Sequence, residues 1–183
     1  MDEMPEFPIK MVGERNFHPF HLLINAAQET LDEMREYQYG GSAFVLSTML
    51  LSALAIEALA NSIGSHKVSN WSDYESASPI AKLRIVSSEL CIDFNKDESP
   101  WREARELIKF RNQIAHAKPK IYKIDKEIRD DNLHELLSPA PSWIEKQINY
   151  ESAEKAFKTI DEIKTLFCAK LDPEKDSAFF VPH

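Results

Sequence analysis

The fold is decided by the stretch from residue 43 to residue 63, which reads AFVLSTMLLSALAIEALANSI. Placed on a helix, this stretch is apolar on nearly every side, which is typical of a helix at the centre of a protein core. We expect Ser42 to cap this helix and Gly64 to stop it. Small polar residues interrupt the run and its length is marginal for a bilayer, so we favour a buried core helix over a membrane span.

The rest of the chain has helical rather than alternating periodicity, and it contains only four glycines. These features predict an all-α protein, an up-and-down bundle of about five helices in a single domain. The expected helices run from residue 17 or 19 to 37, from 43 to 63, from 79 to about 90, from about 99 to 117, and from 151 to 171. Ser99 is expected to cap the fourth helix and Pro100 to open it.

Other segments are expected to lie outside the bundle of residues 17–171. Residues 1–16 form an N-terminal extension, and residues 118–150 form a long excursion with a helical turn or two. Residues 172–183 form a C-terminal tail, and its apolar patch at 179–181 is expected to be either disordered or docked on a partner.

The chain is acidic as a whole but basic in one segment. Its formal net charge is −8 and its pI is about 5.3, which argues against broad adhesion to DNA or to anionic membranes. Residues 98–120 nevertheless contain six basic and three acidic side chains. Two distant cysteines and an N-terminus without signal-peptide features indicate reduced thiols and a cytoplasmic location. Any nucleic-acid contact is therefore expected at this local basic patch.

Two charged residues stand in apolar settings. Glu57 is the only charged residue between Gly40 and Gly64, and Arg111 projects from the middle of the apolar arc of the fourth helix. Neither charge can be buried without a partner. We therefore predict that Glu57 and Arg111 form an ion pair, which would leave further guanidinium donors for another anion.

A second stripe runs along the same helix. Arg105, Lys109, Asn112 and His116 follow one another at helical spacing, and His116 lies about 140° around the helix from Arg111. The helix is therefore predicted to present Arg111 toward the core and His116 toward an open groove.

The residues from Arg111 to His116 read RNQIAH and resemble the Rx4-6H motif of the HEPN superfamily. This motif favours a polar residue directly after the arginine, as Asn112 is here. A small helical bundle with this motif on a late helix, packed on an apolar helix that bears an acid, is also similar to that superfamily. Glu57 is the corresponding acid here. The resemblance spans residues 17–171 as architecture, but only about six residues as a motif.

The resemblance implies a metal-independent endoribonuclease of a bacterial toxin–antitoxin or defence system, without cofactors. It implies a homodimer whose two motifs share one cleft, an RNA substrate and an antitoxin protein as a further partner. Arg111 would contact the scissile phosphate, His116 would move protons at the ribose 2′-OH or the leaving 5′-oxygen, and Asn112 would orient one of them. Glu57 would support Arg111. The basic residues expected to bind RNA are Arg105, Lys109, Lys118 and Lys120.

Two other functions remain open. One is a catalytically silent helical module for RNA binding, protein interaction or dimerisation, in which Arg111 and Glu57 are only a structural pair. The other is a regulatory bundle with an enclosed apolar pocket for a small ligand.

Further residues could serve a site or the core. His18 and His21 are one turn apart and could share a metal, but no third ligand is evident. Trp71, Tyr74 and Trp143 could stack on bases, or they could pack in the core or against a partner.

Overall fold

The computed structural model describes residues 17–36, 41–121 and 141–180. The protein is all-α, as predicted, and these residues form five α-helices and no strand. The α-helices are α1 (Pro19–Glu36), α2 (Gly41–Lys67), α3 (Pro79–Glu89), α4 (Trp101–Ala115) and α6 (Tyr150–Cys168). Short 3-10 helices are η1 (Trp71–Tyr74), η2 (Glu145–Gln147) and η3 (Ser177–Phe179).

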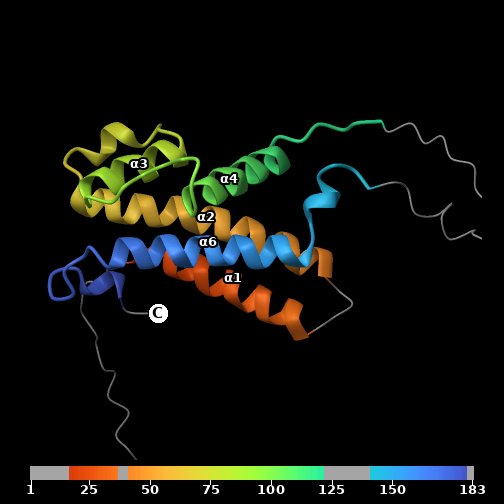
Figure 1. The fold of residues 1–183 in the computed structure, drawn as a ribbon, viewed down its shortest axis with the longest axis horizontal. Helices are drawn as coiled ribbons and strands as arrows, with labels where there is room; N and C mark the ends of the chain where they lie inside the picture. The colour runs from red at the N-terminus through yellow and green to blue at the C-terminus, as the bar shows by residue number, and fades with distance from the viewer. Residues whose placement is uncertain (1–16, 37–40, 122–140, 181–183) are drawn as a thin grey trace, which may run out of the picture.

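The α2 helix is the centre of the core, as its composition predicts. It contacts α1 and α6 as well as α3 and α4, and Figure 1 shows it between these two pairs. Its apolar side chains without exposed surface are Ala53, Ala55, Ile56, Leu59, Ala60 and Ile63. Helix α4 packs mainly on α2 and α6, so α2 positions the helix that carries the motif.

By length and composition alone, α2 could also cross a membrane. It has 27 residues and its most apolar window has a mean hydropathy of 2.0, with half of that window buried in the fold. The core helix of a soluble protein has the same properties, so this is weak evidence for a membrane location.

Both predicted ends of α2 are wrong. The helix already includes Gly41, so Ser42 lies within its first turn instead of capping it. Gly64 does not stop the helix, which continues to Lys67. The indole of Trp71 packs directly on Gly64, where an added Cβ would lie 2.5 Å from the ring. A glycine is required there for close approach rather than for termination.

The other helices follow the predictions with small shifts. Ser78 caps α3 by accepting a hydrogen bond from the Ala81 N–H, and Asn149 caps α6 in the same way from Ser152. Helix α4 starts at Trp101 after Pro100, which has no side-chain cap bond, so the predicted cap at Ser99 is wrong. Tyr37 and residues 122–140 lie outside the described residues.

The C-terminal segment packs on its own chain through Asp176 and Phe179, which corrects the prediction of a disordered or partner-docked patch for Phe179, whereas Phe180 is 40% exposed. Phe179 is 2% exposed and stacks 6.2 Å from the Phe20 ring, with His18 at 4.5 Å. Asp176 is equally buried and accepts hydrogen bonds from His66 at 2.7 Å and Lys67 at 2.8 Å. The ends of α1 and α2 therefore hold this segment, while Val181 lies outside the described residues.

The Asp176 carboxylate is the ionic anchor of that segment. Burial alone would raise its pKa, but hydrogen bonds from Lys67, the Asp172 N–H and His66 outweigh burial and lower the pKa to about 2. The anchor is therefore ionised at neutral pH.

Candidate functional site

The α4 helix carries the motif and ends within it. Its buried side chains are Trp101, Ala104, Leu107, Ile108 and Phe110. The last helical residue is Ala115, and the His116 N–H still donates to the Asn112 carbonyl over 3.0 Å. His116 therefore stands at the helix end, where it is exposed.

Arg111 and Glu57 form the predicted ion pair. Arg111 Nη2 donates to Glu57 Oε2, and the two side chains are 23% and 27% exposed. Arg111 Nε is buried and has no hydrogen-bond partner in the described part of the chain. The pair thus joins α4 to α2 and fixes the guanidinium while only part of its donor capacity is used.

A second basic side chain lies beside Glu57 and was not predicted from the sequence. Lys82 of α3 places its Nζ 3.8 Å from Glu57 Oε1, and its side chain is only 6% exposed. Its position beside Leu83 and four residues before Val86 puts it on the apolar face of α3, which is the argument that identified Arg111. Each oxygen of Glu57 therefore has one basic neighbour.

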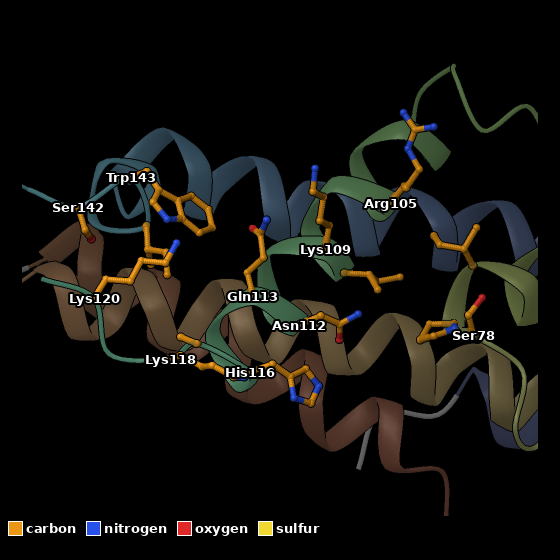
Figure 2. A pocket seen from close by; sticks show the side chains of 15 residues that line it. Ser78, Arg105, Lys109, Asn112, Gln113, His116, Lys118, Lys120, Ser142 and Trp143 are labelled. Atoms are coloured by element: carbon orange, nitrogen blue, oxygen red, sulfur yellow. The ribbon is translucent and has the colours of Figure 1, made fainter. Parts of the chain in front are cut away.

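The predicted stripe of α4 lines one groove. Arg105, Lys109, Asn112 and His116 all border a cavity of about 840 Å³, together with Lys118 and Lys120 (Figure 2). Its walls come from the start of α3 at Pro79 and Ile80 and from the turn at 142–144. The volume lies in the range of ligand-binding sites. All four residues predicted to bind RNA thus share a groove with two of the three predicted catalytic residues.

Within residues 17–36, 41–121 and 141–180, most of the charges in this groove have no acidic partner. Arg105 pairs with Asp97 at 3.2 Å. Lys109, Lys118 and Lys120 are exposed, and none forms an ion pair with another residue of the described ranges. Because exposed lysines attract anions when no carboxylate neutralises them, the groove favours an anionic ligand.

Arg111 does not line the groove. Its guanidinium is held on the α2 side of α4, whereas Asn112 and His116 border the groove. The structure therefore divides the three predicted catalytic residues between two sides of one helix, as their spacing predicts. A single chain does not bring all three together.

The other aromatic candidates differ in their surroundings. Trp71 is buried, Tyr74 lies 5.9 Å from it but is 39% exposed, and Trp143 lines the groove. Within the described residues, no group of three or more His, Cys, Asp or Glu side chains could hold a metal ion, so His18 and His21 lack a third such ligand there.

Comparisons of the chain with protein-family models, curated proteins and solved structures gave no match. The residues themselves carry the functional argument.

Proposed function

We propose that this protein is a HEPN-like, metal-independent endoribonuclease that acts in the cytoplasm as a homodimer, in a bacterial toxin–antitoxin or defence context. The observation that carries the proposal is the groove beside α4. It combines an exposed imidazole, the amide of Asn112 and lysines that have no acidic partner among the described residues, in a protein of net charge −8. Such a local concentration of positive charge supports binding of a polyanion.

The chemistry follows from the groups at hand. The ribose 2′-oxygen attacks the adjacent phosphorus while the bond from phosphorus to the 5′-oxygen breaks. One group accepts the 2′-OH proton and another protonates the leaving oxygen. An imidazole can perform either transfer near neutral pH, and His116 is the exposed imidazole of the groove. The products are a 2′,3′-cyclic phosphate and a 5′-OH.

Arg111 stabilises the negative charge that develops on the phosphate. Its planar fork matches phosphate oxygens, and Glu57 already fixes its orientation. Because Arg111 and His116 occupy different sides of α4, the Arg111 of one subunit acts with the His116 of its partner.

The test is cleavage of labelled RNA in the presence of EDTA. The wild-type protein should cleave tRNA or total RNA and leave 2′,3′-cyclic phosphate ends, and His116→Ala should be slower by about 10²–10⁴-fold. Lys158→Gln is a suitable control because Lys158 is 76% exposed on α6, outside the groove. Equal cleavage by wild type and His116→Ala, or none by either, would overturn the enzymatic proposal.

The Arg111–Glu57 pair specifically favours a second candidate, a catalytically silent module for RNA binding or protein interaction. In that case the pair only joins α2 to α4, and the same surface serves a second copy or an antitoxin protein. RNA binding without cleavage, with a dimeric mass in light scattering, would support this alternative.

A further inference from the structure

Trp143 differs from the other two tryptophans of the chain in its exposure. Trp71 and Trp101 are 9% and 4% exposed and belong to the core, whereas Trp143 is 39% exposed and lines the groove. An indole left partly in water provides a large apolar face for a ligand at low entropic cost.

The backbone around Trp143 is fixed by a local hydrogen-bond network. The Ser142 hydroxyl accepts from the Glu145 N–H at 3.2 Å, and the Glu145 carboxylate accepts from the Ser142 N–H at 2.5 Å. Gln147 adds a bond to the Trp143 carbonyl at 3.2 Å. This reciprocal capping arrangement holds the turn that presents the indole, so a ligand does not have to order it on binding.

The surroundings of the indole combine apolar and cationic groups. Ile144, Ile108 and Ile80 provide apolar walls, and Lys118 and Lys120 border the same cavity. In the view of Figure 2, Gln113 lies between Trp143 and Asn112. Its amide offers both a donor and an acceptor. An aromatic face beside lysines is the usual arrangement for binding single-stranded nucleic acid, in which bases stack and phosphates pair.

We propose that Trp143 is a stacking platform for an unpaired nucleobase of single-stranded RNA, that Gln113 hydrogen-bonds the edge of this base, and that Lys118 and Lys120 contact its phosphates. This inference rests on the proposed function and deepens it by assigning a strand state and a base-binding residue to the groove. Bases within a duplex are stacked on each other, so their faces cannot lie on the indole.

The test measures binding separately from cleavage. Single-stranded RNAs of about ten nucleotides, with every 2′-OH methylated, lack the nucleophile of the reaction but keep bases and phosphates. They are titrated into the full-length protein while tryptophan emission and the anisotropy of a labelled 5′ end are recorded. Because Trp71 and Trp101 are buried, a change of emission on binding is expected to come from Trp143.

Single strands should quench the wild-type emission, and Trp143→Phe should abolish that quenching while it retains most of the affinity. Trp143→Ala should weaken binding by about ten- to one hundredfold. Gln113→Leu should reduce the preference among homopolymers of the four bases. Tyr74→Ala is the matched control, because Tyr74 is also 39% exposed but does not line the groove, and it should bind like wild type.

Three results would overturn the inference: equal affinity of Trp143→Ala and wild type, absence of quenching by every single strand, or equal quenching by a duplex. Quenching and Trp143-dependent binding without cleavage of unmodified RNA would leave this inference standing and defeat the proposed catalysis. Cleavage of RNA that does not depend on Trp143 would defeat this inference and leave the proposed catalysis standing.

Discussion

The charged side chains on the two sides of α4 differ in burial and in ion pairing. On the α2 side, Arg111 is three-quarters buried and paired with Glu57, which also neighbours Lys82. On the groove side, His116 and Lys109 are exposed, and Lys109 has no acidic partner among the described residues.

From this difference we infer that the α2 side of α4 stabilises the fold, whereas the groove side is available to bind a ligand. A partly buried ion pair is expensive to break because it leaves an uncompensated charge, whereas exposed cations contribute little to stability and remain available to an anion. Changes on the α2 side should therefore alter stability, and changes on the groove side should alter RNA binding or cleavage alone. Arg111 is the exception, because we assign it to both.

Arg111→Ala should have the largest effect among the changes that test this contrast. It should slow RNA cleavage by about 10²–10³-fold, because the phosphate loses its preorganised donor. It should also lower the free energy of unfolding by about 1–3 kcal/mol, a value reduced by partial exposure of the pair. Cleavage rates and urea unfolding at one fixed protein concentration measure the two effects.

Glu57→Gln is the matched control for Arg111→Ala, because it removes the carboxylate and keeps the guanidinium. It should destabilise the fold to a similar degree and reduce cleavage much less. Equal losses of cleavage in both variants would show that Arg111 has only a structural role.

The C-terminal anchor tests whether a paired carboxylate away from α4 affects stability alone. The pKa of Asp176 falls from 3.8 to about 2 on folding, so its ionised form stabilises the native state by about 2 kcal/mol. That stabilisation is complete above about pH 4 and is lost as the pH falls toward 2. The Asp176→Asn variant should lack this stabilisation at neutral pH, and its affinity for RNA should not change.

Urea unfolding at pH 7 and at pH 3 measures this prediction. The difference between wild type and Asp176→Asn should shrink at pH 3. A difference that is constant with pH would refute the assigned anchor, and a weakened affinity for RNA would connect the C-terminal segment to the groove.

Lys109→Gln should have the smallest effect. It should weaken RNA binding a few-fold and reduce the slope of log K against log salt by about 0.7, the contribution of one phosphate contact to a single strand. Unfolding should change by less than about 0.5 kcal/mol. Anisotropy titrations at salt concentrations from about 50 to about 200 mM measure this slope, because electrostatic binding of nucleic acid weakens strongly over that range. An unchanged slope, or the same change of slope in Lys158→Gln, would show that the RNA phosphates do not contact Lys109.

The helical periodicity was enough to predict the fold class, the central helix and the inner partner of Arg111. These follow from local rules, because an apolar stripe must be buried and a charge on it must find a partner. The same rule applied to α3 would have identified Lys82. The end of α2 could not be predicted in this way, because Gly64 meets Trp71 only after the chain has folded back.

The error in the C-terminal tail also comes from contacts between distant residues. Asp176 and Phe179 look like a polar tail with an apolar patch in the sequence, and only the fold brings them to His66 and Phe20. The groove itself joins α4 to the turn at Trp143, which lies beyond a long segment without clear periodicity. The spacing of Arg111 and His116 did predict that they face different sides of α4.

We propose that Arg111 of one subunit acts with His116 of the other. Mixing the inactive variants Arg111→Ala and His116→Ala tests it directly, with native mass spectrometry to confirm that mixed dimers form. About one quarter of the wild-type cleavage rate should be recovered, because half of the dimers are mixed and each regains one of its two sites. Mixed dimers that cleave RNA no faster than either parent variant would contradict a site shared between subunits.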